Sequence, residues 1–423
     1  MINKFVFSFK KEIQEIKKDF LSNLKINSLN IVFFAQRGFN PKNGGIERVS
    51  DVLAKGFSEA GHHVEYVTWH SEDECGEFIP PFNQLILPDQ EQVCGSDNIK
   101  AFANLVISAN VDVIICQYAL EREETVLPYL VKKKTGVKLI YVYHSSPNFE
   151  ALSLENLPRP ILSREKRWHR QFKRITRIVF KKQKQAARNK RVGALFSELY
   201  AMGDALVVLS EKYIPVVQQL SGINSTEKLY AIGNPNTYHT SEVIIGKKEN
   251  TVLFVGRLYS EKRPEKAMQL WQRVQYKFPD WNMKMLGVGS LKKDLRELHQ
   301  VLNLERFFLE GSQNPQSYYA KAKIFIMLSD YEGFPMALTE AMHYGVVPVV
   351  FNTFQALPEI IEDNVTGVSV TPFDLDEFEE KLTVLMCNDE KRAKMAEKAR
   401  VSVERFALPN IIKKWEEIFE KIM

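Results

Sequence analysis

Short apolar runs alternate with longer segments of helical period along the whole chain. Near-continuous apolar strands separated by helix-length segments are typical of parallel sheets that helices cover on both faces. The pattern occurs twice, before and after a polar, turn-rich stretch at about 233–250. The sequence therefore predicts two doubly wound α/β domains whose facing strand ends form a cleft. The predicted strands are residues 30–35, 64–68, 112–116, 138–143, 205–209, 251–255, 283–287, 306–309, 323–328, 347–351 and 368–370.

The two predicted domains, residues 29–235 and 236–404, are flanked by two amphipathic segments. Residues 1–28 place apolar side chains at helical spacing with lysines between them. This pattern suits either a helix packed on the protein itself or one that lies on a membrane surface. Residues 405–423 are also amphipathic, and we expect them to form a helix that crosses back to the first domain.

The composition is that of an ordinary globular protein, and it excludes several classes. The four cysteines lie far apart without a Cys-x-x-Cys pair, so neither a zinc site nor a disulfide framework is indicated. A reducing cytosol is therefore the expected compartment. No apolar run approaches the roughly 18 residues of a membrane span. The N-terminus lacks the apolar segment and cleavage site of a signal peptide.

The net charge of +5 is uninformative until it is located along the chain. Residues 161–192 carry a net +12, so the other 391 residues together carry −7. A mildly acidic protein therefore contains one strongly basic stretch. Its single acid is Glu165, and its thirteen basic residues are Arg164, Lys166, Arg167, Arg170, Lys173, Arg174, Arg177, Lys181, Lys182, Lys184, Arg188, Lys190 and Arg191.

This stretch has the pattern of a basic amphipathic helix, because Phe172, Ile175 and Val179 recur at helical spacing. Such a helix suits an anionic membrane surface, which predicts a protein held at the inner face of the cell membrane. A solvated helix face is the alternative. Nucleic-acid binding is disfavoured because no recognition motif accompanies the charge. The residues expected to face the membrane are Lys173, Arg174, Arg177, Lys181 and Lys182.

The segment Glu332–Glu340 follows a predicted strand and opens a predicted helix, with Pro335 suited to the first helical position. The backbone amides around Gly333–Met336 are expected to form an anion site at the helix N-terminus. Glu332 precedes the helix and Glu340 lies inside it, so the two carboxylates can flank a polyhydroxylated ligand. Alternatively, both are ordinary solvated acids at the start of a helix.

A second segment, residues 255–264, directly follows another apolar strand. Gly256 allows a sharp turn, after which Arg257 and Lys262 project from the carboxyl end of the strand toward the same cleft. Arginine offers a fork for phosphate oxygens and lysine offers a point charge. Two such cations near a helix N-terminus predict a diphosphate site, and surface cations on a loop are the alternative.

Two features of the first domain point to the same cleft. Gly44 and Gly45 lie between a predicted strand and helix 46–60, where they allow a ligand to approach the backbone at a helix N-terminus. His144 ends strand 138–143 and is expected at the mouth of the cleft, where it could contact a sugar hydroxyl or a reacting group. Strand-to-helix glycines and strand-end histidines are also common for structural reasons alone.

Taken together, these motifs resemble the retaining glycosyltransferases of family 4, which have the GT-B fold. The similarity is dense from about 251 to 370 and sparse from 65 to 135. The sequence around Glu332 is similar to that of the subgroup of these enzymes that builds capsule, O-antigen and exopolysaccharide repeat units. One departure is the stretch 354–359, where many relatives are rich in glycine before the Pro-Glu pair; Glu359 itself fits the family pattern.

The resemblance implies a nucleotide-diphosphate sugar donor, expected to be a UDP-sugar, and roles for matching residues. Arg257 and Lys262, with Gly256 beneath them, would hold the diphosphate and stabilise the leaving phosphate. Glu340 would bind the ribose hydroxyls. Glu332 would bind hydroxyls of the donor sugar, beside the backbone of Gly333, Phe334, Pro335 and Met336.

The resemblance also implies that Gly44 and Gly45 lie near the diphosphate and the acceptor, and that His144 contacts the donor sugar. The expected acceptor is a glycan, lipid-diphosphate-linked, and the expected mechanism is a front-face transfer with retention. We expect no metal requirement, because Arg257 and Lys262 can supply the positive charge. A nucleotide-sugar epimerase of similar build and a non-catalytic sugar-nucleotide-binding protein are the alternatives.

Overall fold

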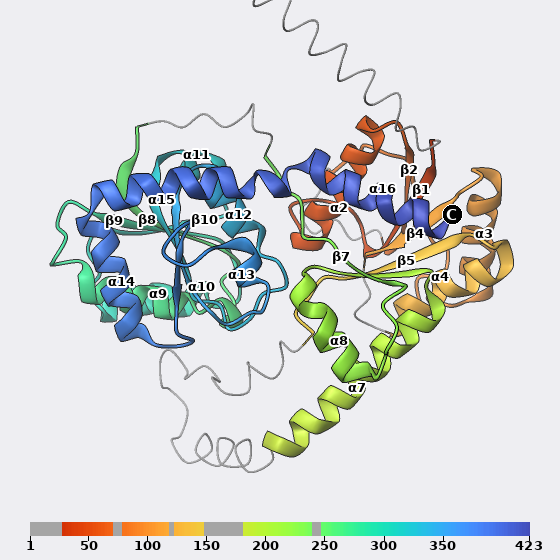
Figure 1. The fold of residues 1–423 in the computed structure, drawn as a ribbon, viewed down its shortest axis with the longest axis horizontal. Helices are drawn as coiled ribbons and strands as arrows, with labels where there is room; N and C mark the ends of the chain where they lie inside the picture. Colours follow the sequence, from red (N-terminus) through yellow and green to blue (C-terminus); the bar gives the residue numbers. More distant parts are fainter. Residues whose placement is uncertain (1–27, 71–77, 118–121, 148–180, 239–246) are drawn as a thin grey trace, which may run out of the picture.

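The computed structural model describes residues 28–70, 78–117, 122–147, 181–238 and 247–423 of the 423-residue chain. Two α/β domains lie side by side, each built on a parallel sheet that helices cover (Figure 1). The predicted fold class, two doubly wound domains facing each other, is confirmed.

The first domain contains a seven-stranded sheet of order β3-β2-β1-β4-β5-β6-β7, and its neighbouring strands are parallel. The strand order reverses between β1 and β4, which is where sheets of this type bind ligands. The strands are β1 (Asn30–Arg37), β2 (His63–His70), β3 (Gln84–Ile86), β4 (Val113–Cys116), β5 (Lys138–Tyr143), β6 (Ala205–Val208) and β7 (Leu229–Ala231). The helices are α2 (Gly45–Glu59), α3 (Ser96–Ser108), α4 (Arg122–Thr135), α7 (Lys181–Met202), η1 (Glu211–Tyr213) and α8 (Ile214–Ser221).

The second domain contains a six-stranded sheet of order β10-β9-β8-β11-β12-β13, again parallel. Here the order reverses between β8 and β11. The strands are β8 (Glu249–Val255), β9 (Asn282–Leu286), β10 (Phe307–Gly311), β11 (Ala322–Met327), β12 (Val347–Phe351) and β13 (Val368–Val370). The helices are η3 (Ser260–Lys262), α9 (Pro264–Val274), α10 (Lys292–Val301), α11 (Gln316–Lys321), α12 (Met336–His343), α13 (Leu357–Ile360), α14 (Leu375–Cys387), α15 (Asp389–Ser402), η4 (Val403–Phe406) and α16 (Leu408–Ile422).

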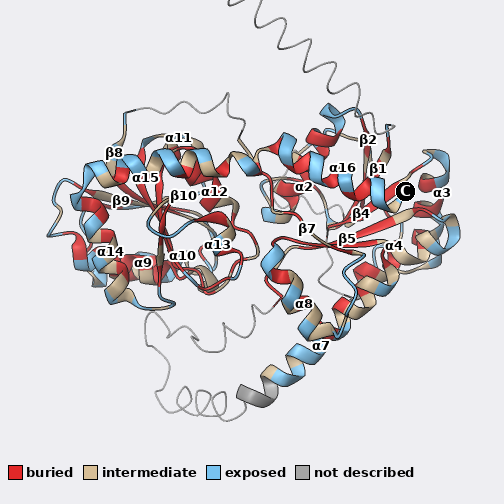
Figure 2. Ribbon diagram, in the orientation of Figure 1, coloured by how far each residue is buried: buried red, intermediate tan, exposed pale blue. Residues whose placement is uncertain are grey.

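Every strand predicted from the apolar runs is present, with ends that differ by a few residues. The central strands are buried on both faces, which explains why their sequences are apolar throughout (Figure 2). The sequence prediction missed β3 and β7. Each strand has only three residues, and the two lie at opposite edges of the first sheet. Such a short apolar run does not stand out from the sequence around it.

The chain crosses between the domains twice. The first crossing follows β7, and the second runs through η4 into α16. Asn236 N donates a hydrogen bond to Phe406 O over 2.7 Å, so the two crossings lie side by side. The helix α16 then packs on α2, where the rings of Trp415 and Phe57 meet edge to face with centroids 6.1 Å apart. The predicted return of the last helix to the first domain is confirmed (Figure 1).

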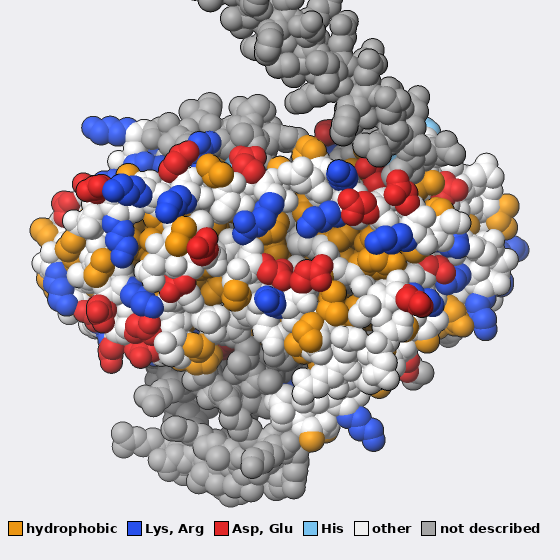
Figure 3. Space-filling view, in the orientation of Figure 1, with side chains coloured by type: hydrophobic (Ala, Val, Ile, Leu, Met, Phe, Trp, Pro, Cys, Tyr) orange, Lys and Arg blue, Asp and Glu red, His pale blue; other side chains and the backbone are white. Residues whose placement is uncertain are grey.

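The surface shows no separation of charge on the face drawn in Figure 3, where Lys and Arg side chains are interspersed with Asp and Glu over both domains. None of the helices within the described ranges is long and apolar enough to cross a membrane. Residues 1–27 and 148–180, which contain most of the two predicted amphipathic segments, lie outside the described residues.

Candidate active site

The candidate site lies where the carboxyl ends of the two sheets face each other. From the second domain, the loops after β8 and β11 meet, because these two strands are neighbours in the sheet. From the first domain, the segments after β1, β5 and β6 approach the same place. The structure therefore brings together most of the motifs that the sequence singled out, as expected for sheets that bind at their switch points.

Lys262 and Glu332 form the central ion pair of this site. The Lys262 Nζ atom lies 2.6 Å from both carboxylate oxygens of Glu332. Ser329 Oγ donates a third hydrogen bond, 2.7 Å long, to Glu332 Oε1. Glu332 is only 8% exposed, and 20% of the Lys262 side chain is accessible. A buried carboxylate needs such partners, and here they also fix its orientation.

A second ion pair, more deeply buried, supports the first from behind. Arg263 Nε donates to Asp330 Oδ1 over 2.6 Å, and Arg263 Nη1 lies 3.7 Å from a carboxylate oxygen of Glu265. Burial raises the pKa of Asp330 to about 6, against the opposite influence of Arg263. The backbone also joins the two loops, since Asp330 N donates to Glu261 O over 2.7 Å. These contacts hold the loops that carry Lys262 and Glu332 against each other.

The sequence analysis did not single out Arg263, although it lies inside the second motif. Its backbone is in the left-handed region at φ 52°, directly before Pro264 at the start of α9. A non-glycine residue in this conformation needs support from its surroundings. The two buried carboxylate neighbours provide it, but they could be identified only in three dimensions.

Arg257 is placed differently from Lys262. Its side chain is 64% exposed, lies over the ring of Tyr259 and is 3.8 Å from a Glu261 carboxylate oxygen. The structure thus puts Arg257 at the rim of the site, apart from the Lys262–Glu332 pair, and its predicted role in binding the diphosphate stays a prediction.

The turn at Gly256 is packed against the turn formed by Gly287–Gly289. Gly287 has φ 143°, and a Cβ atom there would lie 1.8 Å from Gly256 O. Only glycine therefore allows this approach. Leu258 N donates to Val288 O over 2.8 Å, which holds the loop after β8 in place.

Two helix N-termini meet across the cleft. Gly44 and Gly45 begin α2, while Pro335 directly precedes α12, which begins at Met336. A Cβ atom on Gly45 would lie 3.7 Å from the end of the Met336 side chain, so this side chain reaches from the start of α12 to the start of α2. Helix N-termini present free amides and a positive dipole end, and this arrangement suits an anion. Pro335 is the residue before the helix, one position earlier than the sequence predicted.

His144 directly follows β5, at the edge of this region. Its Nε2 atom lies 2.5 Å from Gln117 Oε1, and this hydrogen bond forms when Nε2 carries the proton, because an amide oxygen only accepts. Burial lowers the pKa of His144 to about 3, which keeps the ring neutral at physiological pH. The other ring nitrogen, Nδ1, is then an acceptor for a ligand hydroxyl. The sequence analysis did not identify Gln117, which ends the neighbouring strand β4.

Gly333 is in direct contact with the first domain. A Cβ atom at Gly333 would lie 2.5 Å from His144 O and 3.2 Å from Ser145 Cα, so any side chain would collide with the main chain there. Gly333 was predicted to free a turn. Its second role is to let the two domains approach, and nothing in the local sequence indicates that role.

Tyr213 of the first domain, and Asn234 and Asn236 of the segment that follows β7, hold the Glu332–Glu340 segment by its carbonyl groups. The Tyr213 hydroxyl lies 3.0 Å from Glu332 O and 2.7 Å from Gly333 O. Asn234 Nδ2 donates to Phe334 O over 3.0 Å, and Asn236 Nδ2 contacts Thr339 O at 3.3 Å.

The Phe334 side chain is buried between the domains, with its ring 5.1 Å from that of Phe406. This burial fixes the loop between the two motif glutamates by packing. Only the backbone of Phe334 is thus left for the ligand contact that the sequence predicted.

Glu340 is separated from the Lys262–Glu332 pair and almost fully buried, at 1% exposure. Arg48 Nη2 of α2 lies 2.8 Å from Glu340 Oε1, and the Thr237 hydroxyl donates to the same oxygen. Tyr319 OH lies 3.2 Å from Oε2. In this structure both carboxylate oxygens are therefore engaged by the protein. The predicted contact of Glu340 with a ribose stays a prediction and requires some of these bonds to exchange.

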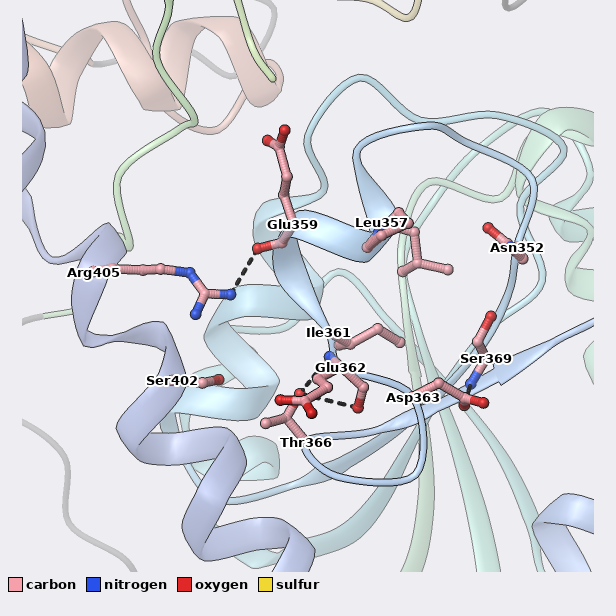
Figure 4. Close-up of a pocket in the computed structure, with 11 residues that line it drawn as sticks. Asn352, Leu357, Glu359, Ile361, Glu362, Asp363, Thr366, Ser369, Ser402 and Arg405 are labelled. Carbon is pink, nitrogen blue, oxygen red and sulfur yellow. Dashed lines mark hydrogen bonds between the residues drawn. The ribbon is translucent and has the colours of Figure 1, made fainter. Parts of the chain in front are cut away.

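Two cavities lie beside the candidate site. One, of about 740 Å³, lies between α13, the turn before β13 and the start of η4; Figure 4 shows Glu359, Glu362 and Arg405 on its walls. The other, of about 610 Å³, follows α2 past Arg48 and Asp51. None of the residues predicted to bind the donor lines the first cavity.

The remaining predictions concern metal and membrane. Within the described residues, no group of three or more His, Cys, Asp or Glu side chains is arranged to hold a metal ion. Lys173, Arg174 and Arg177 lie outside the described residues. Lys181 and Lys182 begin α7, but their side chains are not described.

Comparison with protein families gives two matches that follow each other along the chain. The family described as Glycosyltransferase Family 4 matches residues 43–235. The family described as Glycosyl transferases group 1 matches residues 239–402. The two matches meet at the polar stretch that separates the two sheets.

Several curated proteins are similar in sequence. An uncharacterized glycosyltransferase of Haemophilus influenzae is 26% identical over 379 residues, which cover 89% of this chain and 96% of the relative. The amylovoran biosynthesis glycosyltransferase AmsD of Erwinia amylovora is 28% identical over 222 residues, 50% of this chain and 62% of the relative. An alpha-1,4-N-acetyl-D-galactosaminyltransferase of Campylobacter jejuni is 24% identical over 221 residues, 49% of this chain and 61% of the relative.

Solved structures share the fold over nearly the whole chain. Sucrose-phosphate synthase from Thermosynechococcus elongatus superposes with a TM-score of 0.70 at 16% identity, covering 93% of this chain and 98% of that one. HepE of Anabaena, in complex with UDP-glucose, has a TM-score of 0.68 at 16% identity, covering 92% and 98%. With its two halves matched by glycosyltransferase families and its two sheets arranged as in these structures, the chain belongs to the family 4 glycosyltransferases of GT-B fold.

Proposed function

We propose that this enzyme transfers a sugar from a UDP-sugar to a lipid-diphosphate-linked glycan, with retention at the anomeric carbon, in the synthesis of a cell-surface polysaccharide. The observation that carries the proposal is the Lys262–Glu332 pair beside the facing N-termini of α2 and α12. This arrangement offers positive charge for a diphosphate and a fixed carboxylate for sugar hydroxyls at one place.

The charges suit the chemistry of the transfer. The bond from the anomeric carbon to the phosphate oxygen breaks, and the leaving diphosphate gains negative charge. Lys262 and the helix N-termini interact more strongly with this charge in the transition state than with the donor in the ground state, and this difference lowers the barrier. Glu332 accepts hydrogen bonds from the donor sugar and keeps it in place. On the front-face route, the acceptor hydroxyl attacks the side that the phosphate leaves and gives its proton to a phosphate oxygen.

His144 takes part in this proposal as a neutral acceptor. Its Nδ1 atom can accept a hydrogen bond from a sugar hydroxyl, since Nε2 is committed to Gln117. A neutral ring also avoids placing a second positive charge beside the oxocarbenium-like carbon.

Names and ligands of similar proteins support the donor and acceptor. The solved structures that share the fold include HepE with UDP-glucose and TarM with UDP. The Campylobacter relative is named for an acceptor carried on PP-undecaprenol, and AmsD is named for amylovoran biosynthesis. These point to a uridine nucleotide donor, a lipid diphosphate acceptor and polysaccharide synthesis for this chain as well.

A donor panel tests the reaction. Isothermal calorimetry and product assays with UDP-glucose, UDP-galactose, UDP-N-acetylglucosamine, UDP-N-acetylgalactosamine and GDP-mannose should single out one uridine sugar. Proton NMR of the product should then show the anomeric configuration of the donor. Absence of binding and turnover with every uridine sugar, or an inverted product, would contradict the proposal.

We further propose that the enzyme works as a peripheral protein at the inner face of the membrane. The described part of α7 carries Arg188, Lys190 and Arg191, and this helix extends beyond the body of the first domain (Figure 1). Each basic residue near an anionic surface contributes about 1 kcal/mol to binding.

A vesicle assay tests membrane binding. The protein should sediment with phosphatidylglycerol vesicles at low salt, and high salt should release it. Neutral phosphatidylcholine vesicles are the control. Failure to sediment with the anionic vesicles at low salt would reject membrane docking.

A further inference from the structure

The turn η1 places one tyrosine of the first domain on the donor segment of the second. Tyr213 ends this turn, which follows β6, and its side chain is completely buried. Lys212 N donates to Ser210 Oγ over 3.1 Å, so the turn is held from within. The phenol is therefore carried on a rigid part of the first domain.

The Tyr213 hydroxyl contacts backbone groups of the second domain from three residues. It lies 2.7 Å from Gly333 O and 3.0 Å from Glu332 O, and the backbone of Ala356 is a further hydrogen-bonding partner. The Ser146 hydroxyl, in the first domain, is a further partner. Burial raises the pKa of Tyr213, so the phenol stays protonated and can donate a hydrogen bond to these carbonyls.

The neighbouring residue strengthens this contact. Lys212 N also lies 3.1 Å from Glu359 Oε1 at the end of α13. On the other side, Arg405 Nη2 donates to Glu359 O over 2.6 Å (Figure 4). Figure 4 shows the Glu359 carboxylate pointing away from Arg405, so the two contacts hold α13 from different directions. η1 and the domain crossing thus fix the segments after β11 and β12 together.

We propose that Tyr213 is a positioning residue for sugar transfer, whose hydroxyl fixes the main chain of Glu332 and Gly333 only when the two domains are closed. The inference rests on the proposed function of Glu332. The Tyr213 hydroxyl contacts the main-chain carbonyls of Glu332 and Gly333 and not the Glu332 carboxylate. It acts by holding these two carbonyls in place. The held main chain orients the Glu332 carboxylate and the first amides of α12, which begins three residues after Gly333.

Replacing Tyr213 by phenylalanine tests this role, because only the hydroxyl is lost. We expect kcat to fall about tenfold, equivalent to about 1.4 kcal/mol, while the KM for the acceptor stays within about twofold. Hydrogen exchange of the peptide 329–340 should become faster in Tyr213→Phe. This second measurement needs no substrate, so it tests the contact even if the donor assignment is wrong.

Tyr141→Phe is the matched control. Tyr141 OH donates to Thr125 O over 2.5 Å inside the first domain, fully buried and away from the cleft. It should lower the melting temperature by a similar amount but leave kcat and exchange of 329–340 unchanged. Unchanged exchange in Tyr213→Phe, or faster exchange with unchanged kcat, overturns the inference. A kcat loss of the same size in both variants also overturns it, since stability alone would then explain the effect.

Discussion

At the scale of single residues, the Lys262–Glu332 pair is the feature that the proposed chemistry uses most directly. Lys262→Ala should reduce kcat/KM by about 10²–10³, the typical effect of removing one preorganised donor from developing negative charge. Among the described residues, the same change leaves the buried Glu332 carboxylate with the Ser329 hydroxyl as its side-chain hydrogen-bond partner. Steady-state kinetics with the identified donor measures the effect, and turnover at the wild-type level would contradict the diphosphate assignment.

Arg257→Ala is the informative comparison. The sequence predicts a loss of the same order, whereas the structure shows a guanidinium that is 64% exposed at the rim. A loss as large as that of Lys262→Ala would mean that Arg257 turns inward when the donor binds. A loss below about tenfold would restrict the role of Arg257 to attracting the donor.

The neutral state of His144 leads to a pH prediction. Its pKa is lowered from 6.5 to about 3 by burial, so between these values the unfolded chain binds a proton that the folded chain does not. Below pH 6.5, wild type should therefore lose stability relative to His144→Gln, by up to about 1.4 kcal/mol per pH unit.

Urea unfolding of both proteins at pH 7, 6 and 5 measures this difference. Replacing the exposed His63, which lies at the start of β2, is the control for a histidine that faces solvent. Parallel pH curves for wild type and His144→Gln would show that His144 titrates normally in the folded protein.

Some residues of the candidate site could be predicted from the sequence and others could not. Lys262, Glu332 and His144 could be identified because each follows an apolar strand, and strand ends meet at one edge of a sheet. Tyr213 and Arg48 could not, because their partners lie more than a hundred residues away in the other domain. Their roles depend on how the domains face each other, and no local pattern records this.

At the scale of elements, the apolar runs predicted the strands well because the sheets are parallel and buried on both faces. Among the strands of the described residues, the apolar pattern missed β3 and β7, which are short edge strands. The amphipathic pattern also predicted that α16 returns to the first domain, because such a helix needs an apolar surface on which to bury its apolar face. The start of α12 was placed one residue early, at Pro335, which is ordinary for helix ends.

The packing of α16 on α2 can be tested directly. Trp415 is buried against Phe57, and Trp415→Ala should destabilise the protein by about 3–5 kcal/mol because it opens a cavity between the helices. Lys414→Ala, at an exposed position of the same helix, should change stability by less than about 0.5 kcal/mol. Chemical unfolding compares the two, and equal stabilities would show that α16 is not anchored through Trp415.

At the scale of the whole molecule, the fixed positive charge in the cleft leads to a prediction on metal ions. Lys262 and the N-termini of α2 and α12 already supply charge for a diphosphate, so we expect activity to persist without a divalent cation. Turnover should stay within about twofold after treatment with EDTA. Loss of activity on chelation, with recovery on adding one particular metal ion, would refute this expectation.

The pair of crossings has a consequence for how the cleft can open. A hydrogen bond from Asn236 N to Phe406 O joins the two crossings, so the two segments that connect the domains are tied to each other at this point. Two connecting segments held together at one point restrict the relative rotation of the domains more than one segment would. We therefore expect opening of the cleft to be a hinge rotation near Asn236 and Phe406 rather than a free swivel.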